Sequence, residues 1–231
     1  LQISTFGGQQ VEMANDSLMV LSGGNVEAYE YRRIGGQWVP HEAILTPPSV
    51  VLGQALSMAY DGMSLVTEHR QAFNVGGPPG AVIFWERQGA WVPVQTFTAS
   101  QLGVHPASTG SFFGAPSSVH GDVAAISASS ALLNGHNHVG SVFVMRRTGG
   151  VWALEQRIDH PHPTRPDLFF GGNLVVHGDD LFVTAGDTGW TTQLTVHIFH
   201  YRRNVLGLWE LVDDLEVTPG PGQSAYSVGF G

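Results

Sequence analysis

Short apolar runs separated by tight polar turns make up most of this chain. The runs are about five to seven residues long, and Asp-Gly or Gly-Asp turns between such runs are typical of β-hairpins. Four of them, LMVLS, SLVTE, VAAISA and LFVTA, each follow a tight polar turn, at Asn15-Asp16, Asp61-Gly62, Gly121-Asp122 and Gly178-Asp179. No stretch combines helix caps with a 3.6-residue apolar period. The pattern therefore predicts an all-β protein with many hairpins.

Two sequence anchors recur in the same order along the chain. Tryptophan closes an apolar stretch, a charged pair and a turn at Trp38, Trp91, Trp152 and Trp209, roughly every 57 residues. Upstream of each lies a second anchor, at Phe6-Gly7, Leu52-Gly53, Phe113-Gly114 and Phe170-Gly171, and Phe230-Gly231 restores it at the end. We expect one domain over 1–231 with four repeats, about 6–51, 52–112, 113–169 and 170–229, each of four strands.

The repeat resembles the FG-GAP repeat of bacterial surface proteins and integrin α-subunits. The third repeat carries most of the pattern: Phe113, Gly114, Gly121, Asp122, Gly140, Val142, Phe143, Arg147, Gly149, Gly150 and Trp152. The resemblance implies a β-propeller with blades of four antiparallel strands, either as a four-bladed ring or as part of a larger one. The calcium loops of some family members are missing, because the matching turns hold at most two adjacent acids, as at Asp179-Asp180. Asp16, Asp61, Asp122 and Asp179 are interpreted as turn formers.

Composition excludes several function classes. The net charge of −9 makes nucleic acid an unfavourable partner. Absence of cysteine excludes disulfides and thiolate chemistry. The sequence contains no run of eighteen apolar residues, so no membrane-spanning helix is predicted. The first residues lack the basic and apolar regions of a signal peptide.

Histidine is the strongest hint of metal chemistry. Eleven histidines include two close pairs, His136 with His138 and His160 with His162. Two imidazoles two residues apart could bind one metal, but a third ligand is not evident. All four are interpreted as solvated loop histidines, and no cofactor is predicted.

The tryptophans and arginines have register-dependent roles. The four anchor tryptophans are expected to pack at hairpins between neighbouring repeats, and Trp85 in the core. Arg32-Arg33, Glu86-Arg87, Arg146-Arg147 and Arg202-Arg203 recur at one position, which indicates a shared carboxylate partner, for instance on an adjacent outer strand. Trp190 breaks the register, in a polar loop beside Asp187 and Thr188, and is a candidate ligand platform.

The loops between second and third strands differ most among the repeats, and binding residues are concentrated in such loops. Glu68–Gly80, Ser129–Gly140 and Gly186–Gln193 are expected on one face. The leading hypothesis is a non-catalytic, extracellular or cell-surface binding module with a glycan or protein ligand. Its lectin-like form binds through Asp187, Thr188, Trp190, His136, Asn137 and His138. The alternatives are a metal-assisted hydrolase using loop histidines, although no G-x-S-x-G or H-E-x-x-H motif is present, and a structural fragment that belongs to a larger propeller or assembles with another copy.

Overall fold

The computed structural model describes residues 10–22, 26–45, 47, 55–69, 80–104, 113–163, 168–186 and 195–217. These residues form sixteen strands and no helix, in four separate antiparallel sheets of four strands. The all-β prediction and the four strands per repeat are therefore confirmed. The described residues contain no helix that is long and apolar enough to cross a membrane.

Each sheet is a meander in which strand order follows sequence order. The first sheet contains β1 (Val11–Ala14), β2 (Ser17–Leu21), β3 (Val26–Ile34) and β4 (Gln37–Leu45). The second contains β5 (Ala55–Tyr60), β6 (Ser64–His69), β7 (Ala81–Gln88) and β8 (Ala90–Thr98). The third contains β9 (Phe113–His120), β10 (Val123–Ala128), β11 (Ser141–Thr148) and β12 (Val151–Asp159). The fourth contains β13 (Leu174–His177), β14 (Asp180–Gly186), β15 (Val196–Arg203) and β16 (Trp209–Val217).

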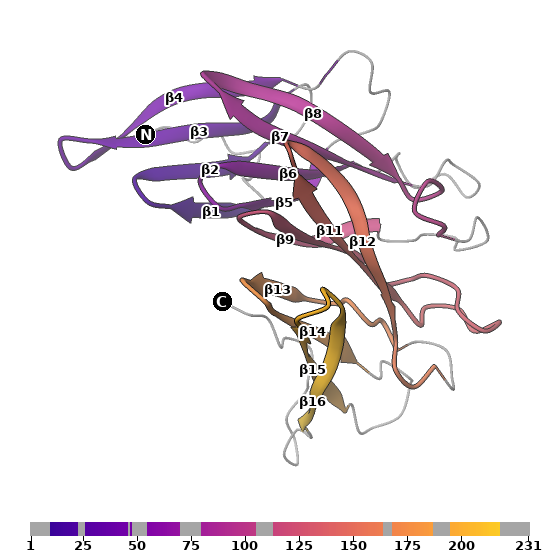
Figure 1. Cartoon of the computed structure of the whole chain (residues 1–231). Coiled ribbons are helices and arrows are strands. Elements are labelled where there is room, and N and C mark those ends of the chain that lie inside the picture. Colours follow the sequence, from indigo (N-terminus) through magenta and orange to yellow (C-terminus); the bar gives the residue numbers. More distant parts are fainter. Residues whose placement is uncertain are drawn as a thin grey trace, which may run out of the picture.

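The four sheets follow one another along an open arc (Figure 1). Their first strands lie side by side, because β5 contacts both β1 and β9, and β9 contacts β13. Their turns also touch: the Gly121 N–H donates to Asp61 Oδ2 at 2.7 Å, and the Gly178 N–H donates to His120 Nδ1 at 3.3 Å. Consecutive sheets therefore stack in the same sense, with first hairpins next to first hairpins.

The core consists of three apolar clusters, and each cluster joins two consecutive sheets. Alternation along a strand explains how one sheet serves two clusters, since neighbouring side chains point to opposite faces. In β7, Ile83 and Trp85 pack toward the first sheet, whereas Val82 and Phe84 pack toward the third. Every residue of β6 and of β10 is buried, as expected for strands covered on both faces.

The third and fourth strands of each sheet share a β-bulge at one repeat position. It lies two to three residues before the arginine that pairs with the anchor tryptophan in all four sheets. A bulge increases local twist, so its recurrence gives the outer hairpins a common shape. The positions are Glu30/Tyr31, Phe84/Trp85, Val144/Met145 and His200/Tyr201.

The Phe-Gly anchor of the third and fourth repeats attaches each sheet to the one before it. Phe113 and Phe170 are fully buried, and the following glycines have φ of +94° and +93°. A Cβ on Gly114 would lie 2.6 Å from Val82 Cγ1, and one on Gly171 would lie 2.5 Å from Ser127 Oγ. Only glycine allows this backbone conformation together with this close approach. The other copies of the anchor, at Phe6-Gly7, Leu52-Gly53 and Phe230-Gly231, lie outside the described residues.

Candidate functional site

The loop between β10 and β11 holds the three predicted site residues that the structure describes, His136, Asn137 and His138. Leu133 and His136 exchange backbone hydrogen bonds of 3.0 and 2.9 Å across Asn134-Gly135. Both central residues have positive φ, 51° and 80°, as a type I′ hairpin turn requires. The Val139 and Gly140 N–H groups donate to Ala131 O, both at 3.2 Å. This loop is thus an ordered structure that leaves Asn137 exposed and both imidazoles half-buried.

His138 is joined to the approach of the fourth sheet. Its ring stacks on Phe169 with centroids 5.1 Å apart and planes at 19°. Its carbonyl oxygen accepts a hydrogen bond of 2.8 Å from the Phe169 N–H. Sequence reasoning missed Phe169, although its position directly before the Phe170-Gly171 anchor could have placed it next to this loop.

Gly140 ends the loop at a position where the backbone leaves no room for a side chain. Its φ is +94°, and a Cβ there would lie 2.2 Å from the Phe170 carbonyl oxygen. The end of the loop is therefore held against the Phe170-Gly171 anchor.

Of the other predicted ligand residues, Asp187, Thr188 and Trp190 lie outside the described residues, as do most of the corresponding loops in the second and fourth sheets.

The interpretation of His160 as a solvated loop histidine is wrong. Its side chain is buried, with ring centroids 5.5 Å from Phe170 and 5.4 Å from Phe199. Its Nδ1 accepts a hydrogen bond of 2.9 Å from the His162 N–H. The flanking prolines suggested an exposed segment, but the aromatic residues that enclose His160 come from the fourth repeat, Phe170 before β13 and Phe199 in β15. His160 therefore packs in the core and fixes the backbone of this connection.

A buried polar pair links the first and second sheets. His69 Nε2 lies 3.0 Å from Glu27 Oε2, and both side chains are fully buried. The same nitrogen lies 3.3 Å from Thr67 Oγ1, which accepts a hydrogen bond of 2.9 Å from Trp85 Nε1. Within the described part of the chain, Glu27 Oε1 accepts no hydrogen bond. No sequence signal marked this pair, because its two members come from different repeats.

One group of side chains among the described residues has the spacing of a metal site: Glu30, His41 and Glu42. Glu30 Oε2 accepts hydrogen bonds from Arg87 Nη1 at 2.6 Å and Trp91 Nε1 at 3.0 Å. Burial alone would raise the pKa of Glu30, but hydrogen bonds from Arg87, Ser17, Trp91 and Arg32 lower it below its ordinary value. Glu42 lies 3.7 Å from the same guanidinium. The two carboxylates of this group, Glu30 and Glu42, therefore surround the guanidinium of Arg87.

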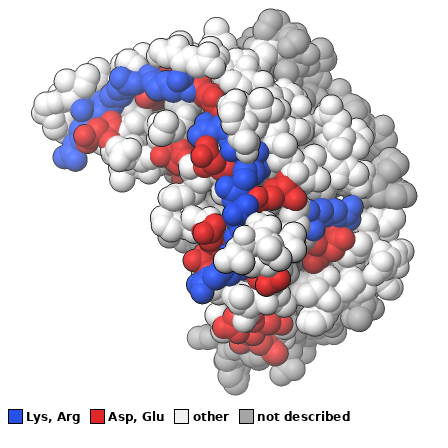
Figure 2. All heavy atoms as spheres, viewed as in Figure 1, with Lys and Arg blue, Asp and Glu red and all other residues white. Residues whose placement is uncertain are grey.

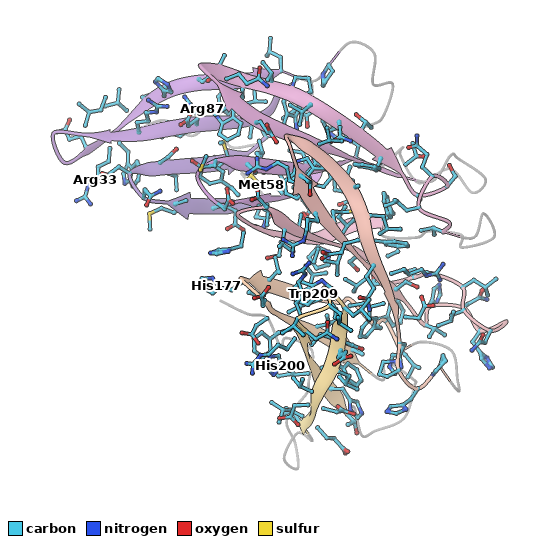
Figure 3. All side chains as sticks on the ribbon, viewed as in Figure 1. Arg33, Met58, Arg87, His177, His200 and Trp209 are labelled. Carbon is cyan, nitrogen blue, oxygen red and sulfur yellow. The ribbon has the colours of Figure 1, made fainter. Side chains whose placement is uncertain are left out.

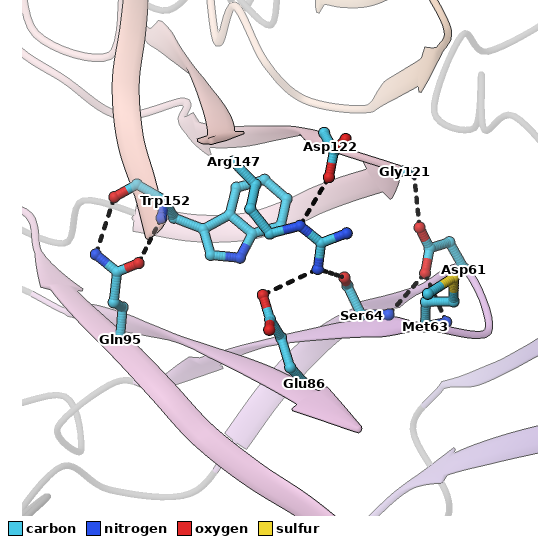
Figure 4. Close-up of polar contacts among 9 residues, drawn as sticks. All are labelled: Asp61, Met63, Ser64, Glu86, Gln95, Gly121, Asp122, Arg147 and Trp152. Atoms are coloured by element: carbon cyan, nitrogen blue, oxygen red, sulfur yellow. Dashed lines mark hydrogen bonds and ion pairs between the residues drawn. The ribbon is translucent and has the colours of Figure 1, made fainter. Parts of the chain in front are cut away.

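Arginine, carboxylate and tryptophan recur at all three boundaries between sheets, which we call seams. At the second seam, Arg147 donates from Nη1 to Glu86 at 2.9 Å and from Nε to Asp122 at 2.8 Å (Figure 4). Its guanidinium carbon lies 5.3 Å from the Trp152 ring centroid, a cation–π distance. Gln95 of the preceding sheet bonds to both the N–H and the carbonyl oxygen of Trp152.

The other seams repeat this arrangement with different carboxylates. Arg87 reaches Glu30 at the first seam, and Arg203 reaches Glu155 at 2.9 Å at the third. The predicted outer-strand partner is thus correct for Glu155 in β12 and for Glu42 in β4, which lies 3.7 Å from Arg87, whereas Glu30 and Glu86 lie in third strands. Charged side chains consequently alternate along the arc (Figure 2), and Arg87 lies between the first two sheets (Figure 3).

Trp91, Trp152 and Trp209 are buried at these seams, and Trp85 is buried in the core, as the sequence predicted. The same prediction is not met at Trp38, which is only half-buried. Among the Asp residues interpreted as turn formers, Asp61 accepts hydrogen bonds from the N–H groups of Met63 and Ser64. Arg87, Arg147 and Arg203 thus have structural roles at the seams, and the β10–β11 loop remains the candidate site.

Comparison with known proteins adds little to this geometry. No protein-family model and no curated protein sequence matches the chain. A crystal structure of a functionally unknown protein from Desulfotomaculum acetoxidans is similar at 11% identity and a TM-score of 0.39, covering 88% of this chain and 68% of that one.

Proposed function

We propose that this chain is a non-catalytic glycan-binding module of the FG-GAP propeller type, acting outside the cell or at its surface. The four sheets are its blades, with the first strands β1, β5, β9 and β13 nearest the propeller axis. Contacts between these first strands, and core clusters shared by consecutive sheets, support this arrangement.

The observation that carries the binding proposal is the ordered loop with Asn137 exposed beside the stacked His138–Phe169 pair. An aromatic surface suits the apolar face of a sugar ring, and an amide with imidazoles can donate and accept hydrogen bonds with its hydroxyl groups. A rigid loop also loses little conformational entropy on binding. We further propose that the corresponding loop of the fourth sheet contributes Trp190, with Asp187 and Thr188, to the same surface.

A glycan array tests this function. We expect the chain to bind a defined subset of glycans, and Asn137→Ala and Trp190→Ala each to weaken that binding at least tenfold. Gln88→Ala, an exposed change in the hairpin at the other end of the second sheet, should leave binding unchanged. Silence across a broad array, or equal binding by all variants, would contradict the proposal.

The metal-assisted alternative has its own readout. His136→Ala with His138→Ala would abolish stoichiometric zinc binding if these two imidazoles held a metal. The group with metal-site spacing found among the described residues includes neither imidazole, so no observation favours this alternative over glycan binding.

A further inference from the structure

Every seam consists of two different halves, contributed by two consecutive sheets. The later sheet contributes its anchor tryptophan and the arginine paired with it, as with Trp209 and Arg203. We call this the leading face of a sheet. The earlier sheet contributes a polar residue four positions after its own tryptophan, together with carboxylates and apolar side chains. We call this the trailing face, and Gln156 at the third seam is an example.

The leading face of the first sheet is uncovered. Strand register places Tyr29 at the position of Ile83, and Met13 at the position of Tyr60. Tyr29 is 40% exposed where Ile83 is 0%, and Met13 is 66% exposed where Tyr60 is 8%. These residues resemble the apolar residues of a seam, but no neighbouring sheet covers them.

The polar groups of this face also lack their seam partners. Trp38 is only half-buried, whereas the three other anchor tryptophans are buried. Arg33, at the register position of Arg87, makes no ion pair within the described part of the chain. It lies near the end of β3 that projects away from the other sheets (Figure 3).

The trailing face of the fourth sheet is uncovered as well. Leu215 is 48% exposed, whereas Ile158, at the same position in the third sheet, is 6% exposed. Asp213 lies four residues after Trp209 and is exposed, where Gln156 and Gln95 each bind the backbone of a following tryptophan. Of the exposed acids of β16, Glu210 and Asp213 lie on this face, whereas Asp214 and Glu216 pair in register with Phe199 and His197 on the face toward the third sheet.

We propose that these two faces bind each other between two copies of this chain, head to tail, so that both seams close into one ring. The leading face brings Arg33 and Trp38, and the trailing face brings the carboxylates of Glu210 and Asp213 and the apolar Leu215. Acidic side chains gather at the fourth-sheet end of the arc, opposite in sign to the unpaired Arg33 (Figure 2). Asp213 can accept the Trp38 N–H, as Glu42 accepts the Trp91 N–H at 3.1 Å.

The number of copies follows from the proposed propeller architecture, on which this step rests. Propellers typically have four to eight blades, and two chains of four sheets supply eight. Head-to-tail contacts add copies until the assembly closes into a ring. A ring of two copies covers both the leading and the trailing face of each copy. A symmetric pairing of two leading faces would instead bring two Arg33 side chains together without a carboxylate.

Sedimentation equilibrium with two face variants tests the proposal. The wild-type chain is expected at twice its 24.8 kDa mass. Tyr29→Asp and Leu215→Asp should each reduce the mass to one chain, and mixing them should restore a pair through the one undamaged seam. Val151→Asp is the matched control, because Val151 is 57% exposed but lies on the third sheet. Circular dichroism melting checks that each variant is folded.

Cross-linking identifies which faces meet. The chain contains no cysteine, so Trp38→Cys and Asp213→Cys introduce unique thiols. A short bis-maleimide should join two chains only when the two variants are mixed. A wild-type mass of one chain, dimers that survive both aspartate variants, or cross-linking within the Trp38→Cys protein alone would each overturn the proposal. The same variants are also tested on the glycan array. Glycan binding by a variant that has the mass of one chain would show that the proposed function does not depend on pairing, so each proposal can fail without the other.

Discussion

The side-chain amide of Gln156 binds both backbone polar groups of Trp209, the N–H and the carbonyl oxygen, in the next sheet. Its Oε1 accepts from the Trp209 N–H at 2.8 Å, and its Nε2 donates to the Trp209 carbonyl oxygen at 2.9 Å. Gln95 and Trp152 repeat the same pair of bonds one seam earlier. An amide supplies a donor and an acceptor at a fixed spacing, which a carboxylate cannot. A single side chain thus sets the register between two sheets.

Gln156→Ala should therefore destabilise the third seam. The change leaves a partly buried N–H and carbonyl oxygen of Trp209 without these partners, which costs about 2 kcal/mol of unfolding free energy. For a domain of this size that corresponds to a Tm lower by roughly 4–8 °C. Gln156→Glu keeps the acceptor and should fall between wild type and Gln156→Ala. Thermal melting measures all three, with the exposed Gln37→Ala as control; an unchanged Tm for Gln156→Ala would contradict the role of the amide.

Gly140→Ala should destabilise the protein far more than Gly121→Ala, although both glycines have positive φ. At Gly140 the new Cβ would lie 2.2 Å from the Phe170 carbonyl oxygen, whereas at Gly121 no atom lies within 4 Å. Gly121→Ala therefore pays only for its backbone conformation, about 1 kcal/mol. Gly140→Ala must also displace the Phe170 backbone, which raises the cost to roughly 3 kcal/mol or more. Urea unfolding of both variants measures the difference, and equal midpoints would show that the close approach is relieved at no cost.

Local sequence pattern predicted the parts of this fold that depend on local structure. The Asp-Gly and Gly-Asp turns set the first hairpins, and the glycine-bearing turns before the anchor tryptophans set the outer ones. Their recurrence predicted four four-stranded sheets. The register of the anchors also predicted that Trp91, Trp152 and Trp209 would be buried.

Contacts between repeats were harder to predict, because they depend on how neighbouring sheets are stacked. Glu27 and His69 meet only because the first and second sheets face each other, and nothing near either residue reveals its partner. His160 was misassigned for the same reason, since Phe199 encloses it from the next sheet. In the candidate site, the sequence identified His136, Asn137 and His138 but missed Phe169, which approaches from another connection.

The Glu27–His69 pair predicts non-additive mutational effects. His69→Leu leaves the fully buried Glu27 carboxylate without its imidazole, which should cost about 3–5 kcal/mol. Glu27→Leu combined with His69→Leu removes both polar groups and should cost less than His69→Leu alone. Chemical denaturation of the two single variants and the double variant provides the cycle. Additive effects would show that the two side chains do not depend on each other.

Glu155 predicts how stability depends on pH. Burial alone would raise its pKa, but hydrogen bonds from Trp209, Arg146 and Arg203 lower it below the ordinary 4.5. A carboxyl group whose pKa is lower in the folded state stabilises the protein above its unfolded pKa, and this contribution is lost as the pH falls through the folded value. Glu155→Gln should therefore be less stable than wild type at pH 7.

The same variant should lose less stability than wild type on acidification below about pH 4.5, since it no longer has this group to protonate. Glu30→Gln should behave alike, because hydrogen bonds from Arg87, Ser17, Trp91 and Arg32 outweigh burial and lower its pKa too. Free energies of unfolding measured by urea titration between pH 7 and pH 3 test both variants. A Glu155→Gln profile parallel to wild type across this range would mean that the Arg203–Glu155 contact at the third seam does not stabilise the folded chain.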